Sequence, residues 1–237
     1  MSDADGLDEG TRDKLVALVR GVAGAAPFCG GLIAEIVSSV IPGQRLDRIV
    51  KYLRALEARL SHLEHSMLAS ALSNPVKIDL IESGGIQAAR ALTDKRIYQI
   101  AEVVSKGIEQ SESDLIRRKR LLAILGEIDD DEVAILNAFG QSYGTGDYSA
   151  WDDINRPEPP HLQADESLLN ENALYEAGVS RLLRLGLVEK KYRIERGSDL
   201  PKFDKHQGEF VGNNEISYLG RMLLREIGIH VPYDDDQ

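Results

Sequence analysis

Apolar residues between positions 46 and 67 recur at alternating intervals of three and four. Helical residues at this spacing share one face, and the alternation is the heptad pattern of a coiled-coil seam. It predicts one long helix, from about Arg45 to Ser73. Two interpretations are open: the seam packs on helices of the same chain, or it joins two copies, and we favour self-association. The seam consists of Leu46, Ile49, Leu53, Leu56, Leu60, Leu63 and Met67.

The stretch from Leu15 to Ile41 is the most apolar part of the chain. Its only charges are Arg20 and Glu35, and Pro27 divides it into two halves. Small residues recur every four positions in each half, which gives each predicted helix a smooth face. One interpretation is a buried hairpin in a core or a subunit interface, and the other is a membrane-active hairpin. We favour the buried hairpin, because each half is shorter than the ~20 apolar residues that a membrane span needs.

Periodic apolar residues also predict helices in the middle of the chain. The first runs from Pro75 to Leu92 and is expected to be interrupted at Gly84-Gly85. Thr93 is expected to cap the next helix, from Lys95 to Ile108. A further helix, opened by residues 111–114, completes an N-terminal helical bundle. We assign residues 1–126 to this bundle and give it a role in assembly.

The pattern changes after residue 126. The acidic run Asp129–Glu132 predicts a helix start, and residues 141–165 show no period and predict a long loop. A helix from Asn172 to Leu185 is then expected to end at Gly186. Alternating residues after it predict a strand, a polar loop and a return strand that reaches Ile216. Residues 127–237 therefore predict an α+β domain, and the chain as a whole is expected to be mainly α.

Two segments of this second domain, Val179–Val188 and Ile216–Gly220, resemble parts of the winged helix-turn-helix superfamily. The first resembles a recognition helix that leads into a wing, and the second resembles the strand and glycine that follow the wing. The resemblance covers roughly residues 131–229 and implies a module for binding DNA or protein. The order of elements along the chain also resembles uncharacterised bacterial proteins of the abortive-infection alpha type, which implies phage defence.

The charge of the chain is uneven. Its net charge is −11, and residues 127–237 hold 11 Lys and Arg against 23 Asp and Glu, a net of −12. Phosphate contacts need cations on the contact face, so this excess argues against generic DNA binding. Residues 181–205 are an exception, with 8 cations against 4 acids, a local excess of +4.

Two groups of cations are candidate contacts for a nucleic acid or an acidic partner. One is the only dense basic run of the chain, and the other lies on the predicted recognition helix and the strand after it. A basic run is also typical of a solvated helix face. The residues are Arg117, Arg118, Lys119 and Arg120 in the run, and Arg181, Arg184, Lys190, Lys191 and Arg193 in the second group.

We find no catalytic constellation at a usable spacing and no set of metal ligands, and expect neither an enzyme, nor a cofactor, nor a small-molecule substrate. Cys29 is the only cysteine and the N-terminus is acidic, so we expect a reduced, cytoplasmic protein without a secretion signal. The leading hypothesis is an oligomeric interaction and assembly protein with a winged-helix-like module. The alternatives are a DNA-binding regulator and a defence effector that acts on membranes through residues 15–41.

Overall fold

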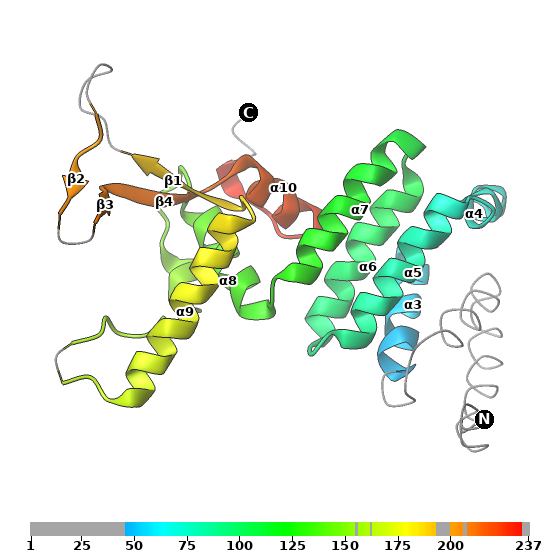
Figure 1. Ribbon diagram of the computed structural model, residues 1–237. Coiled ribbons are helices and arrows are strands. Elements are labelled where there is room, and N and C mark those ends of the chain that lie inside the picture. The colour runs from blue at the N-terminus through cyan, green and yellow to red at the C-terminus, as the bar shows by residue number, and fades with distance from the viewer. Residues whose placement is uncertain (1–45, 155, 162, 193–199, 206–207, 234–237) are drawn as a thin grey trace, which may run out of the picture. The chain divides into compact units, whose positions relative to one another are not determined.

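A computed structural model of the chain describes residues 46–154, 156–161, 163–192, 200–205 and 208–233. Within these residues the fold is mainly helical, with small antiparallel strand pairs towards the C-terminus (Figure 1). The chain divides into two compact units, Met1–Ala123 (unit 1) and Ile124–Gln237 (unit 2). Each unit is described by itself below. The stretch Leu15–Ile41 lies outside the described residues.

Unit 1 consists of helices that pack side by side. Helix α3 packs on α5 and α6, and α5 packs on α6 and on the short helix α4. Side-chain oxygens cap two of these helices. Asn74 Oδ1 accepts from the Val76 N–H at 2.9 Å, and Thr93 Oγ1, as expected, accepts from the Arg96 N–H at 3.1 Å. The helices are α3 (Leu46–Leu60), α4 (His65–Leu72), α5 (Pro75–Arg90), α6 (Asp94–Glu109) and α7 (Glu112–Glu127), of which α7 continues past Ala123 into unit 2.

The prediction of one long helix from Arg45 to Ser73 is wrong, because the chain turns after Leu60. The Leu63 N–H donates to the Leu60 carbonyl at 3.0 Å, which is a turn rather than a continued helix. The Ser61 hydroxyl donates to the Ala58 carbonyl at 2.9 Å and competes with the helical backbone bond there. Glu64 then starts α4 in an extended conformation.

The heptad positions within α3 form part of the unit's own core. Ile49, Leu53, Leu56 and Leu60 are all buried, so the alternative in which the seam packs inside the chain holds for these four. Each of the four is at most 8% exposed. Past the turn, Leu63 is half-buried and Met67 is exposed, and the side chain of Leu46 lies outside the described residues.

The expected interruption at Gly84-Gly85 is also wrong, since α5 is continuous from Pro75 to Arg90. Gly84 is buried against α3 and α6. A β-carbon at this position would lie 2.4 Å from Tyr52 Oη and 2.9 Å from Val104 Cγ2. The Tyr52 hydroxyl in turn donates to the Ile81 carbonyl at 3.1 Å. The glycine therefore lets three helices approach closely instead of breaking one of them.

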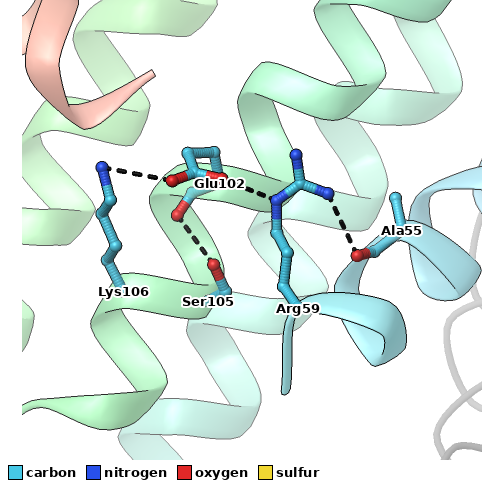
Figure 2. Close-up of polar contacts among 5 residues, drawn as sticks. All are labelled: Ala55, Arg59, Glu102, Ser105 and Lys106. Atoms are coloured by element: carbon cyan, nitrogen blue, oxygen red, sulfur yellow. Dashed lines mark hydrogen bonds and ion pairs between the residues drawn. The ribbon is translucent and has the colours of Figure 1, made fainter. Parts of the chain in front are cut away.

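A polar contact at the edge of this core joins α3 to α6 (Figure 2). Arg59 Nε donates to Glu102 Oε2 at 2.7 Å, and Lys106 Nζ lies 3.3 Å from Glu102 Oε1. Arg59 also donates to the Ala55 carbonyl at 3.2 Å. Burial raises the pKa of the Glu102 carboxyl, but the hydrogen bonds from Arg59 and Lys106 outweigh this and hold the pKa below its ordinary value of 4.5.

Unit 2 begins with helices and ends in a strand pair followed by a helix. Asp165 Oδ1 caps α9 by accepting from the Leu168 N–H at 2.9 Å, so this helix starts before the predicted Asn172. Gly186, with φ of 69°, ends it as expected. The elements are α8 (Asp130–Ser142), η2 (Ser149–Trp151), α9 (Glu166–Arg184), β1 (Val188–Tyr192), β2 (Phe203–Asp204), β3 (Glu209–Phe210), β4 (Gly212–Ile216) and α10 (Tyr218–Glu226).

Strands β1 and β4 pair antiparallel, from Val188 opposite Ile216 to Tyr192 opposite Gly212. This is the strand and return strand that the sequence predicts. Between them the chain forms a second pair, β2 with β3, which the sequence analysis did not predict. Figure 1 shows this second pair at the far end of the ribbon formed by β1 and β4. We call residues 188–192, 200–205 and 208–216 the wing.

Ser217 joins the base of the wing to α9 and α10. Its hydroxyl donates to the Gly186 carbonyl at 2.6 Å and accepts from the Gly220 N–H at 3.0 Å. Its backbone N–H donates to the Leu187 carbonyl at 3.0 Å. A β-carbon on Gly220 would lie 2.2 Å from that same carbonyl oxygen, so only glycine fits there. We call this set of contacts the Ser217 junction.

Replacing Gly84 with alanine is expected to destabilise unit 1 by about 1–3 kcal/mol, because the new methyl group overpacks the buried Tyr52 ring. Urea unfolding followed by circular dichroism measures the loss, and amide exchange in α5 and α6 assigns it to unit 1. The matched change is Gly178→Ala in α9. A β-carbon there meets Glu132 and Ile135 at 3.4–3.8 Å, so helix propensity dominates and unit 2 gains about 0.5–1 kcal/mol. Equal signs for the two variants would contradict this packing.

Ser217→Ala is expected to cost unit 2 about 1–2 kcal/mol, because it removes the cap of α10 and the donor to Gly186. Amide exchange of β1, β4 and α10 measures the loss. Ser180→Ala, on the exposed face of α9, is the control and is expected to change stability by no more than about 0.5 kcal/mol. Equal effects of the two changes would show that the junction does not hold the wing.

Candidate functional site

Two of the four described cations that were predicted on α9 and β1 are paired with acids of unit 2. Arg181 is held by Glu132, with its NH1 atom 3.3 Å from a carboxylate oxygen, and it reaches the Glu127 carbonyl at 3.5 Å. On β1, Lys191 Nζ lies 2.8 Å from Glu189 Oε1, and this pairing raises the pKa of the lysine. Arg184 is exposed, Lys190 lies opposite Asn214 in the strand register, and Arg193 lies outside the described residues.

Glu132 explains why Arg181 is held. Its side chain is only 4% exposed, and it forms a reciprocal capping box with Asp129 at the start of α8, with both hydrogen bonds at 2.8 Å. Burial raises the pKa of the Glu132 carboxyl above its ordinary value of 4.5, and the charge of Asp129 raises it further. The Asp129 N–H and Arg181 oppose this rise. Arg181 is therefore an ion-pair partner of a buried carboxylate in the same unit.

The basic run of α7 is also used within its own unit. Lys119 forms an ion pair with Asp79 of α5, and Arg118 Nε donates to Gln110 Oε1 at 3.1 Å. Arg117 lies 3.5 Å from Asp114 of the same helix. Arg120 is exposed. These pairings favour a structural role for most of the run.

An exposed aromatic cluster on the wing was missed by the sequence analysis. Tyr192, Phe203 and Phe210 are 47%, 53% and 43% exposed. The Phe210 ring stands edge-on to both others, with centroid distances of 6.0 Å to Tyr192 and 5.3 Å to Phe203. Leu200 and Val211 are exposed nearby in the chain. We call these five residues the wing patch.

The wing carries no excess of either charge. Its four lysines are balanced by four acids, so its formal net charge is zero. The local excess of +4 counted over residues 181–205 includes Arg181 and Arg184, which belong to α9 and not to the wing. Glu209 and Glu215, which follow residue 205, offset the rest. The lysines are Lys190, Lys191, Lys202 and Lys205, and the acids are Glu189, Asp204, Glu209 and Glu215.

The long loop after α8 is held by its tryptophan. The Trp151 ring stands edge-on to Phe139 at 4.8 Å, and its indole N–H donates to Ser142 Oγ at 3.4 Å.

Arg221 of α10 lies over the rings of Tyr143, Tyr218 and Tyr233, at 4.8–5.5 Å from their centroids. These contacts engage the aromatic side chains of the loop and of α10 within unit 2.

Within the described ranges, no group of three or more His, Cys, Asp or Glu side chains is placed to hold a metal ion. The helices described here include none with the length and apolar character needed to cross a membrane. Comparison with models of protein families, with curated proteins and with solved structures found no match.

The raised pKa of Glu132 predicts a pH dependence for unit 2. The folded unit binds its proton more tightly than the unfolded chain, so this stabilisation is full below pH 4.5 and is lost as the pH rises through the raised pKa. Glu132→Gln is expected to remove this decline in stability. Urea unfolding at a series of pH values from 4.5 upwards measures the decline, and amide exchange in α8 assigns it to unit 2. An unchanged decline would contradict the burial of a carboxylate at this position.

Glu102 in unit 1 supplies the contrast. Its pKa is lowered, so its stabilisation is present above pH 4.5 and is lost as the pH falls through the lowered pKa. Glu102→Gln is therefore expected to flatten an acid-side decline, followed by amide exchange in α6. Each variant is expected to remove only the decline in stability of its own unit. If either variant removed both declines, a global charge effect rather than these two sites would set the pH response.

Proposed function

We propose that unit 2 is a winged-helix-like interaction module that binds a partner protein through the wing patch, and that the chain works by binding rather than by catalysis. The observation that carries the proposal is the exposure of three packed aromatic rings on a hairpin of zero net charge. Solvent-exposed clusters of large apolar side chains are typical of interaction sites. Aromatic residues also supply much of the binding energy at protein interfaces.

The order of elements supports the same proposal. A helix that ends at a glycine, a strand, a hairpin and a return strand follow one another in unit 2, as the resemblance to winged helices implies. Winged helices that bind DNA present cations to phosphates. Here the cations of α9 and β1 are partly paired with acids, which favours a protein over a nucleic acid as the partner.

DNA binding is the second candidate, and the exposure of Arg184 at the end of α9 is the observation that favours it. A variant with Arg184→Glu and Lys190→Glu tests it without touching the Arg181 contact to the buried Glu132. Salt-dependent binding of duplex DNA by the parent, lost in this variant, would favour the DNA regulator over a protein-binding module. The membrane alternative rests on residues 15–41, which lie outside the described part of the chain.

Phe203→Ser with Phe210→Ser is expected to remove the partner while leaving the fold intact, because both rings are largely exposed. We expect at least about a tenfold loss of bound partner, since two aromatic anchors each contribute about 1 kcal/mol or more at an interface. Quantitative mass spectrometry of proteins that co-purify with the parent and the variant from the same cells measures this loss. Unit 2 is expected to lose about 1–2 kcal/mol of stability, because the two edge-on ring contacts of Phe210 are removed.

The matched control is Tyr98→Ser with Ile116→Ser, which removes two exposed apolar side chains from unit 1. It is expected to retain the proteins that the wing variant loses. Identical sets of co-purifying proteins in the parent, the wing variant and the control would contradict the proposal.

A further inference from the structure

A groove in unit 2 lies between α8, α9 and the loop after η2. Its volume is about 460 Å³, within the range of clefts that hold a small ligand or a few side chains. The wall on α9 is one helical face, since Glu171, Leu174, Gly178 and Arg181 follow one another at intervals of three or four. The lining residues are Asp129, Asp131, Glu132, Ala134, Ile135, Asp153, Ile154, Glu171, Leu174, Tyr175, Ala177, Gly178 and Arg181.

The charged lining of this groove is strongly one-sided. It has five carboxylates and one guanidinium, a formal excess of four negative charges. The start of α8 accounts for Asp129, Asp131 and Glu132, because acids stabilise a helix N-terminus. It does not account for Asp153, which comes from the loop, or for Glu171, which lies beyond the first turn of α9. Three separate elements thus bring acids to one groove.

The rest of the lining is apolar. Ile135 of α8, Ile154 of the loop and Ala177 of α9 line the groove together with the acids. Leu174 of α9 lines it too and is 75% exposed. A groove lined by both acidic and apolar side chains matches a ligand that carries both cations and an aliphatic side chain.

We propose that this groove binds a short segment of a partner protein in which lysines or arginines flank an aliphatic side chain. The cations face Asp131, Asp153 and Glu171, and the aliphatic side chain lies against Leu174 and Ile154. A free polyamine satisfies only the charges and leaves the apolar lining in water. The groove and the wing patch share no residue, so this site goes beyond the function proposed above and does not depend on it.

A second copy of the chain is a poor occupant of the groove. Its densest basic run is the one in α7, where Lys119 already pairs with Asp79 and Arg118 with Gln110. Binding these cations in another copy's groove costs the contacts that they make in unit 1. The α7 run of a second copy is therefore a poor occupant, and the occupant that we propose comes from a different protein.

Fluorescence anisotropy with the full chain and a labelled, terminally blocked peptide, Lys-Arg-Leu-Lys-Arg, tests the proposal in about 150 mM salt. Asp131→Asn with Asp153→Asn is expected to weaken binding about five- to tenfold, since each lost exposed charge pair contributes modestly. Asp130→Asn with Asp152→Asn is the matched control. It removes an acid from the same helix turn and another from the same loop, but neither lines the groove, and it is expected to bind as the parent does.

A second variant tests the apolar part of the site. Leu174→Ser is expected to weaken binding of the leucine peptide about threefold or more and to leave binding of a Lys-Arg-Ser-Lys-Arg peptide unchanged. Equal affinity of the parent for the two peptides would overturn the proposal. So would equal losses in the two aspartate variants, the absence of saturable binding, or binding of spermidine as tight as that of the leucine peptide.

Discussion

Unit 2 depends on the Ser217 junction. The Ser217 hydroxyl donates to the carbonyl of Gly186 and accepts from the N–H of Gly220, while the Ser217 N–H donates to the Leu187 carbonyl. These bonds tie the end of α9 to the start of α10 at the base of the β1–β4 ribbon. Because the chain leaves this point through only two paired strands, the junction decides where the wing patch is held. A local polar contact thus supports an apolar surface at a distance from it.

Unit 1 depends on close packing rather than on polar contacts. Gly84 lets the Tyr52 ring reach the backbone of α5, where the Tyr52 hydroxyl donates a hydrogen bond to the Ile81 carbonyl. The apolar seam of α3 fills the space beside it. The Arg59 and Glu102 pair lies at the edge of this core. The seam that suggested self-association therefore explains why the bundle folds.

Local chemistry made much of the fold predictable from the sequence. The caps Asn74, Thr93 and Asp129 and the stop at Gly186 are read from single residues and their neighbours. The predictions were wrong where tertiary contacts determine the structure. Glycine is a poor helix former, but Gly84 lies inside a continuous helix because Tyr52 packs against it. The heptad pattern gave no sign of the turn after Leu60, because its apolar spacing continues through that turn. The site was harder still. Charge counts located the cations of α9 and β1, but not their partners Glu132 and Glu189, and no period marks Phe203 and Phe210 as neighbours across a hairpin.

The central claim is that the wing patch contacts a protein. A photoreactive phenylalanine analogue placed at Phe210 tests it most directly when it is activated in living cells, with the same analogue at Tyr98 as the reference position. We expect a discrete covalent adduct to another protein from position 210, absent from position 98 and lost when Phe203 is changed to serine. Adducts to nucleic acid from position 210, or identical adducts from both positions, would contradict it.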